Sequence, residues 1–267
     1  MMVLAGCAPS PAPVESRPAA AAAQSTSDDV PVHGFEVVRA IPHDAAAFTQ
    51  GLVYHDGFLY ESTGLEGQST LRQLEIATGR VLRRHELAPH IFAEGLTIWR
   101  DTLLQLTYMN RMAFAYDLRT FAPKGTFSYE GQGWGLTHDG SRLIMSDGQP
   151  ALRFLESATW RELGRVTVTD RGRPVVDLNE LEFIRGEVWA NVWHTERIAR
   201  IDPASGRVTA WIDLTGLRPA TARRDSESVL NGIAFDAEGE RLFVTGKLWP
   251  FLYEIRVREG GRSGGVR

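Results

Sequence analysis

The sequence has few of the features that crosslink or anchor a chain. Its 267 residues include one cysteine, Cys7, so no internal disulfide can form and stability must come from packing. No apolar run approaches the roughly 20 residues that a membrane-spanning helix needs. The seven histidines show no paired spacing typical of zinc ligands. We therefore expect neither a metal nor another cofactor.

The sequence also lacks a large excess of charge of either sign. The net charge is -4, and the 29 basic residues are scattered along the chain without forming a stripe or alternating with aromatic residues on one face. This distribution argues against a nucleic-acid partner. With 43% hydrophobic and 23% charged residues, the chain is long enough for one large globular domain.

The two ends differ in composition from the middle. Leu4-Ala5-Gly6-Cys7 resembles a bacterial lipobox, although Met1-Met2-Val3 supplies almost nothing of the preceding signal peptide. Either the true start lies upstream or the match is accidental and the thiol incidental. Favouring the first, we predict a truncated signal and disordered Pro/Ala/Ser-rich tether over 1–32, lipid-anchored at Cys7 in the bacterial cell envelope, periplasmic or extracellular. We expect 259–267 to be a disordered tail.

The middle of the chain repeats. Five stretches place a polar or aromatic residue before a small residue or Glu, followed by an apolar run, and they are anchored on Gly51, Gly95, Gly135, Glu180 and Gly232. The anchors lie 44, 40, 45 and 52 residues apart. Periods of this size with short apolar runs and Asp-Gly turns are typical of a β-propeller.

The last unit lacks a visible fourth strand, whereas 34–41 reads as a strand that precedes the first unit. Because an unpaired strand edge is a liability, we expect 34–41 to pair with the last unit. The prediction is an all-β fold over 33–258, a five-bladed β-propeller whose fifth blade is closed by the N-terminal strand. At most one helical turn is expected, around 219–225.

In a propeller, the loops that lead into the innermost strands open on one face. Residues just before the anchors should therefore converge there, together with residues from neighbouring strands. The expected set is Phe48, Gln50, Glu94, Tyr108, Trp134, Asn179, Glu180, Trp193, Asn231, Lys247 and Trp249. A carboxylate, amides, an amine and aromatic rings at one mouth suit a small polar ligand.

Taken singly, these residues have plainer explanations. A Glu before Gly is more often a solvated or turn-stabilising acid, and a Trp in a propeller is as often part of the core. A lysine such as Lys247 on a surface hairpin would need no functional explanation. The combination is more specific. Its stretches are Phe48-Thr49-Gln50-Gly51-Leu52, Glu94-Gly95-Leu96-Thr97, Gly133-Trp134-Gly135-Leu136, Leu178-Asn179-Glu180-Leu181-Glu182, Trp189-Ala190-Asn191-Val192-Trp193, Leu230-Asn231-Gly232-Ile233-Ala234 and Thr245-Gly246-Lys247-Leu248-Trp249-Pro250.

In this order and spacing, the stretches resemble the β-propeller glutaminyl-peptide cyclotransferases of plant latex and bacteria over 35–257. The resemblance implies conversion of N-terminal glutamine in peptides or proteins to pyroglutamate with release of ammonia, without metal. We also expect a monomer. It implies Glu94 as the catalytic acid and substrate contacts from Phe48, Gln50, Trp134, Asn179, Trp193 and Lys247. Tyr108 stands where the family commonly has Trp, and Ala93 where a larger apolar residue is common.

The residue types fit this chemistry. The α-amine must attack its own side-chain carboxamide, so the enzyme has to hold a folded-back conformer and transfer a proton. A buried carboxyl with a raised pKa can make both transfers, and we assign this role to Glu94. Donors from Asn179, Gln50 and Lys247 would hold the oxyanion, while the aromatic residues, Trp249 included, would enclose the substrate. Lys247 could instead only tune Glu94.

Two alternatives stay open. A divalent-metal-dependent lactonase-like hydrolase could use Glu94, Asn179 and Asn231 as ligands, and loss of activity with a chelator would favour it. A non-catalytic binding propeller could use Glu94 to recognise an amine. Ammonia release from a glutaminyl peptide would exclude the binding propeller.

Overall fold

The computed structural model describes residues 29–260, and every regular element in that range is a β-strand. Three antiparallel sheets contain four strands each, in chain order. They are β2 (Thr49–His55), β3 (Phe58–Thr63), β4 (Thr70–Glu75) and β5 (Val81–Glu86); β6 (Ala93–Trp99), β7 (Thr102–Thr107), β8 (Met112–Asp117) and β9 (Pro123–Ser128); β10 (Leu136–His138), β11 (Leu143–Met145), β12 (Ala151–Leu155) and β13 (Glu162–Thr167). A two-stranded hairpin, β14 (Thr169–Asp170) and β15 (Arg173–Pro174), follows.

The remaining strands form one eight-stranded sheet in the order β16-β17-β18-β19-β1-β22-β21-β20. They are β1 (Val32–Pro42), β16 (Leu178–Ile184), β17 (Glu187–Val192), β18 (Arg197–Ile201), β19 (Val208–Asp213), β20 (Leu230–Asp236), β21 (Arg241–Gly246) and β22 (Phe251–Arg258). The stretch 34–41 lies within β1 and pairs antiparallel with β22. The first residues of β1 pair parallel with β19, through Val32 opposite Trp211 and His33 opposite Ile212.

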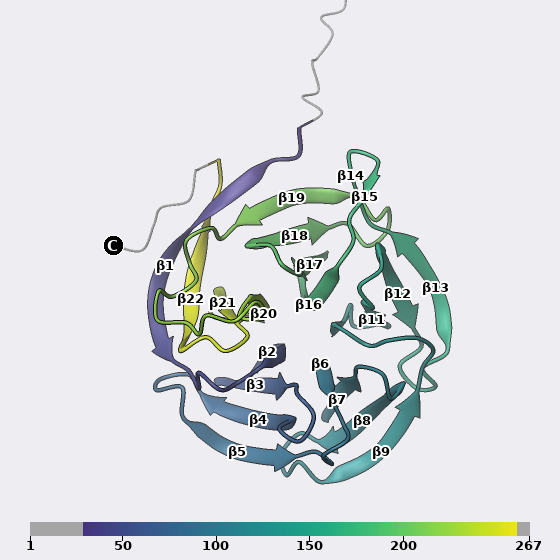
Figure 1. Ribbon diagram of the computed structural model, residues 1–267. Helices are drawn as coiled ribbons and strands as arrows, with labels where there is room; N and C mark the ends of the chain where they lie inside the picture. Colours follow the sequence, from purple (N-terminus) through teal and green to yellow (C-terminus); the bar gives the residue numbers. More distant parts are fainter. Residues whose placement is uncertain (1–28, 261–267) are drawn as a thin grey trace, which may run out of the picture.

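The sheets are arranged around a common centre (Figure 1). The first strand of each unit, β2, β6, β10, β16 or β20, lies innermost, and each of these strands contacts the next around the centre. The strands β5, β9, β13, β19 and β1 lie at the rim (Figure 1). Apolar side chains fill the space between neighbouring sheets; one cluster joins Tyr60 and Leu71 of one sheet to Leu96 and Leu103 of the next.

The anchor glycines are explained by close approach of neighbouring inner strands. A Cβ on Gly51 would lie 2.4 Å from the Leu96 nitrogen, and one on Gly135 would lie 2.0 Å from the Asn179 carbonyl oxygen. Such distances are shorter than any van der Waals contact, so only glycine lets these backbones meet. The repeat found in the sequence is therefore the repeat of inner-strand contacts.

Polar side chains also connect the inner strands. Glu180 on β16 accepts hydrogen bonds from the backbone of two other inner strands, from Ile233 N–H of β20 at 2.8 Å and from Leu52 N–H of β2 at 3.3 Å. Glu182 accepts one from Phe235 N–H at 3.1 Å, and burial raises the pKa of Glu182 to about 8. Burial, and secondarily the Glu182 charge, raises the pKa of Glu180 well above its usual value. These acids tie strands together rather than face a ligand.

The expected helical turn is absent from the described chain. Around Pro219, hydrogen-bonded turns replace it, such as the bond from Ala222 N–H to the Pro219 carbonyl at 2.9 Å. No helix among the described residues is long and apolar enough to cross a membrane. Cys7, most of the proposed tether and most of the proposed tail lie outside the described residues. The last tether residues are described and are not a free tether: the Pro31 carbonyl accepts from Trp211 N–H at 2.9 Å, and Val32 begins β1.

Candidate active site

A cavity of about 650 Å³ opens where the segments leading into the inner strands converge. Eight of the predicted site residues line it: Phe48, Gln50, Glu94, Tyr108, Trp134, Asn179, Trp193 and Lys247. Sequence reasoning did not assign seven further lining residues: Leu65, Gln68, Phe92, Arg223, Asp225, Glu227 and Leu248. Phe92 stands two residues before Glu94, so the repeat pattern could have identified it. Arg223, Asp225 and Glu227 lie in a loop outside the repeat, where no sequence signal pointed to them.

Three of the residues expected to converge do not line the cavity: Glu180, Asn231 and Trp249. Trp249 packs in the core instead. Its side chain is 1% exposed and belongs to an apolar cluster with Leu230 and Tyr253. Its indole Nε1–H donates to the Ser228 carbonyl at 3.4 Å. The physical reason is the turn at Leu248, where a φ of 61° sends consecutive side chains in different directions. Lys247 and Leu248 therefore line the cavity while Trp249 packs in the core.

Glu94 lies at the start of β6 and is 5% exposed. Gln50 Nε2 donates a hydrogen bond to Glu94 Oε1 at 3.0 Å. The Gln50 amide is oriented in turn, because its Oε1 accepts from Asn231 Nδ2 at 3.1 Å, and the same nitrogen donates to the Thr49 carbonyl at 3.0 Å. Gln50 therefore presents an N–H to the acid in a fixed direction.

The electrostatics of Glu94 favour its neutral form. Burial raises the pKa of Glu94 well above its usual value, and the Lys247 charge offsets this only in part. No ion pair joins the two side chains in the described structure. A carboxyl that is neutral near neutral pH holds a proton that it can donate.

Lys247, at the start of the turn between β21 and β22, is 3% exposed. Its ammonium lies 4.8 Å from the ring centre of Phe48 and 5.9 Å from that of Trp193, distances at which a cation is attracted to an aromatic face. Burial lowers the pKa of Lys247, while Glu94 and Glu227 act in the opposite direction. Among the described residues its ammonium makes no hydrogen bond, so its donors are available to a ligand.

Aromatic rings make up much of the wall. Trp134 and Trp193 meet edge to face with ring centres 5.6 Å apart, and Phe92 contacts Phe48 at 6.0 Å and Tyr108 at 5.8 Å. These contacts fix the rings against one another. The wall therefore leaves a rigid apolar slot beside the acid.

Two buried polar atoms of this wall have no hydrogen-bond partner in the described structure: Asn179 Oδ1 and Trp193 Nε1. Buried polar groups are normally paired, so an unpaired acceptor and an unpaired donor in a cavity point to a polar ligand. Asn231, a ligand in the metal alternative, does not line the cavity and is bonded to Thr49 and Gln50. No three His, Cys, Asp or Glu side chains within 29–260 cluster closely enough to hold a metal ion.

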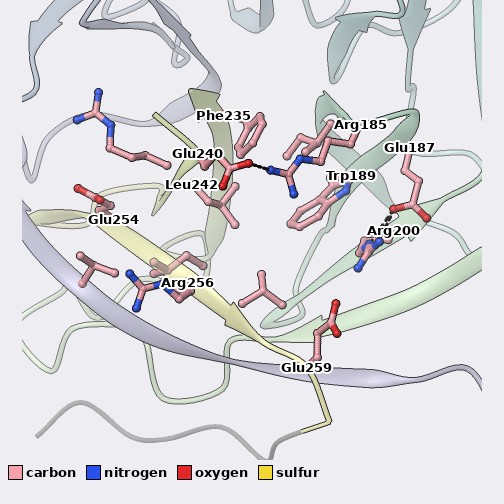
Figure 2. A pocket seen from close by; sticks show the side chains of 15 residues that line it. Arg185, Glu187, Trp189, Arg200, Phe235, Glu240, Leu242, Glu254, Arg256 and Glu259 are labelled. Atoms are coloured by element: carbon pink, nitrogen blue, oxygen red, sulfur yellow. Dashed lines mark hydrogen bonds and ion pairs between the residues drawn. The ribbon is translucent and has the colours of Figure 1, made fainter. Parts of the chain in front are cut away.

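A second cavity, also of about 650 Å³, lies between β16–β18 and β20–β22, and Figure 2 shows its lining. Its charges are largely paired: Arg185 with Glu240, and Arg200 Nη2 with Glu187 at 2.7 Å. Arg185 also lies 5.6 Å from the ring centre of Phe235. This cavity has no buried unpaired acid comparable with Glu94.

Comparisons with known proteins identify the family of the chain. Residues 12–257 match the family described as glutamine cyclotransferase. A glutaminyl-peptide cyclotransferase of Arabidopsis thaliana is 41% identical over 238 residues, covering 88% of this chain and 74% of that protein. The crystal structure of Myxococcus xanthus glutaminyl cyclase matches with a TM-score of 0.82 and 38% identity, covering 87% of this chain and all of that one. The chain belongs to the glutamine cyclotransferase family.

Proposed function

We propose that the protein is a glutaminyl-peptide cyclotransferase that converts N-terminal glutamine of peptides or proteins to pyroglutamate and releases ammonia. The observation that carries the proposal is the buried Glu94, whose pKa burial raises, lining a cavity together with unpaired polar atoms and the buried Lys247. The activities of the relatives from Arabidopsis thaliana and Myxococcus xanthus support the same reaction.

The reaction forms one bond and breaks another. The uncharged α-amine attacks the carbon of its own side-chain carboxamide, and the bond from that carbon to the amide nitrogen then breaks. The attacking nitrogen loses one proton and the departing nitrogen gains one. Glu94 carries out this exchange by donating its proton towards the leaving nitrogen and accepting the proton of the amine, so the carboxyl ends as it began.

The other residues supply positioning and charge. Lys247 and the Trp193 indole N–H are donors for the carboxamide oxygen, which becomes negative in the tetrahedral intermediate. Asn179 Oδ1 accepts from the substrate amine or amide. Gln50, which the sequence suggested as an oxyanion donor, donates one N–H to Glu94 and therefore orients the acid. The aromatic wall holds the folded-back conformer and excludes water.

The test is incubation of the purified protein with a short glutaminyl peptide, with a glutamyl peptide as control. We expect ammonia release and a matching mass loss from the glutaminyl peptide, unchanged by a chelator. Loss of activity with the chelator would favour a metal-dependent hydrolase. Binding without ammonia release would favour a non-catalytic propeller.

We infer that the sheets form five propeller blades over 33–258, with the eight-stranded sheet made of two blades joined at the rim. The cyclic contacts of five inner strands and the pairing of β1 with β22 support this count. Deleting 1–31 should then leave a folded protein, whereas deleting 1–42 removes β1 and exposes the edge of β22, causing aggregation or a large loss of stability. Equal melting temperatures for the two truncations would contradict the closure.

We also propose that the protein is a monomer anchored to the bacterial cell envelope through a lipid on Cys7. The lipobox-like Leu4-Ala5-Gly6-Cys7 supports the anchor. Labelled fatty acid should be incorporated into the full chain and not into Cys7→Ser. Equal labelling of both would contradict the anchor.

A further inference from the structure

We propose that His43 is a positioning residue for the reaction. As an imidazolium it donates one ring N–H to the backbone beside Lys247. It donates the other to Glu61, which in turn holds the start of the strand at Gln50. The inference rests on the proposed function, because it assigns a role in that reaction. His43, Glu61, Thr49 and Trp249 form what we call the clamp. None of the four lines the cavity.

The geometry of His43 requires both ring nitrogens to carry hydrogen. Nδ1 lies 2.9 Å from the Trp249 carbonyl oxygen, and Nε2 lies 2.9 Å from Glu61 Oε1. A carbonyl oxygen and a carboxylate oxygen only accept hydrogen bonds. The ring must therefore donate on both sides, which a neutral imidazole cannot do.

The surroundings of the ring stabilise that charge. Burial by itself lowers the pKa of His43, but attraction and hydrogen bonding to Glu61 and the Trp249 carbonyl outweigh it, so the pKa lies above its usual value. The other charged groups close by are Arg72, whose Nη1 lies 3.8 Å from Glu61 Oε2, and Asp44, bonded to the same Nη1 at 2.9 Å. Two cations and two anions balance only while His43 is protonated.

One arm of the clamp reaches Lys247. Leu248 follows Lys247 and has a φ of 61°, a left-handed conformation that a branched side chain adopts only where its surroundings impose it. Its N–H donates to the Ala47 carbonyl at 2.7 Å, and the His43 N–H donates to the Pro250 carbonyl at 2.9 Å. Together with the ring bond to Trp249, these contacts hold the strained turn that presents the ammonium.

The other arm reaches Gln50 and through it Glu94. Glu61 Oε1 accepts a hydrogen bond from Thr49 Oγ1 at 2.6 Å, and its side chain is completely buried. Thr49 begins β2 and directly precedes Gln50, whose Nε2 donates to Glu94. When His43 loses a proton, its ring can no longer donate on both sides and one of the two hydrogen bonds breaks. Loss of the Trp249 bond displaces Lys247, and loss of the Glu61 bond displaces Gln50.

The first arm of the experiment needs no variant. With ¹⁵N-labelled histidine, nuclear magnetic resonance should show both ring nitrogens of His43 protonated at neutral pH, and the ring should titrate above the usual histidine range. The signal is assigned by its absence in His43→Gln. A neutral His43 ring in the folded wild type would overturn the proposal. Glu61→Gln, which keeps the acceptor but removes the charge, should make His43 neutral.

The second arm measures kcat and KM across pH for wild type, His43→Gln and His43→Asn. Glutamine places its amide near the Nε2 position and keeps the Glu61 contact, whereas asparagine places it near Nδ1 and keeps the Trp249 contact. We expect each variant to lose between about tenfold and a hundredfold in kcat, as misplacement of reacting groups does, with a smaller change in KM. His43→Gln should also lack the part of the high-pH decline that follows the His43 titration.

The control is His138→Gln, the same substitution at a half-buried histidine that contacts the Ile98 carbonyl at 2.8 Å, away from the cavity. Its kcat and pH profile should match the wild type. If wild type releases no ammonia, the proposed function fails. If wild type is active and folded His43→Gln equals it in kcat and in pH profile, the clamp alone is wrong, because a purely structural histidine would affect stability and leave both unchanged.

Discussion

Two buried glutamates show how partners decide what burial does to an acid. Glu61 is 0% exposed and Glu94 is 5% exposed, so burial raises the pKa of both. For Glu61 this effect is outweighed by His43, by Arg72 and by the Thr49 hydroxyl, and the pKa falls below its usual value. For Glu94 the main offset is the more distant Lys247, and the pKa stays well above its usual value.

The difference separates a structural acid from a chemical one. Glu61 Oε1 accepts from His43 and Thr49, and Oε2, which has no hydrogen-bond partner among the described residues, lies 3.8 Å from Arg72 Nη1. These partners lower the pKa of Glu61, so protonating it would break its cluster. Burial raises the pKa of Glu94, which accepts one hydrogen bond from Gln50 and lines a cavity. Burial without a strong cationic partner is what makes Glu94 suitable for proton transfer.

The largest expected effect comes from Glu94→Gln, which removes the exchangeable proton and keeps the size of the side chain. We expect kcat with a glutaminyl peptide to fall by about 10² or more, the usual range for loss of a general acid or base. Circular dichroism should show an unchanged fold. The same substitution at Glu180, the next buried acid, is the comparison: full turnover in Glu94→Gln with loss in Glu180→Gln would place the chemistry at the other acid.

Next in size is Lys247→Met, which removes the cation that partly offsets the burial of Glu94. If Lys247 holds the oxyanion, kcat should fall by about 10²- to 10³-fold, the effect of losing one such donor. If it only tunes Glu94, the pKa of Glu94 should rise further, moving the high-pH decline upward with little loss at the plateau. We expect the first result, and the matched surface variant Lys124→Met should behave as wild type.

A third difference separates the two acids by stability. Glu61→Gln leaves the buried His43 and Arg72 without their carboxylate and should cost about 3 to 5 kcal/mol of unfolding free energy near neutral pH. Glu94→Gln should stabilise the protein near neutral pH, because the wild-type carboxyl keeps its proton in the fold but ionises on unfolding, and the gain should level off above the folded pKa. Urea unfolding measures both, and Glu75→Gln, at an exposed pair with Arg80, is the control.

The pH dependence follows with opposite signs. Glu61 has a lowered folded pKa, so its contribution is present above the unfolded pKa and is lost as pH falls through the folded value. Glu94 has a raised folded pKa, so its contribution is lost as pH rises through that value. Equal pH dependence of stability in the two glutamine variants would contradict the comparison.

Much of the site could be predicted because it follows the repeat. Gln50, Glu94 and Trp134 each stand just before an anchor glycine, and the close approach of inner strands makes that position converge in every unit. Trp249 could not be placed, because its direction depends on the left-handed turn at Leu248, which sequence does not reveal. The loop with Arg223, Asp225 and Glu227 has no counterpart in the other units.

The clamp could not be predicted from the sequence for a similar reason. His43 follows the end of β1, Glu61 lies in β3 and Arg72 in β4, and no spacing in the sequence marks them as partners. Nothing in the composition distinguishes a buried paired glutamate from a buried unpaired one. The difference in ionisation between Glu94 and Glu61 can therefore be predicted only from their contacts in the folded structure.

The most direct test of the account is the protonation state of Glu94 in the folded protein at neutral pH. Infrared difference spectra of wild type and Glu94→Gln separate the carbonyl stretch of a protonated carboxyl from the band of a carboxylate. We predict a protonated-carboxyl band at neutral pH that is absent from Glu94→Gln and disappears only at a pH well above the usual glutamate range. A carboxylate band from Glu94 at neutral pH would contradict the account.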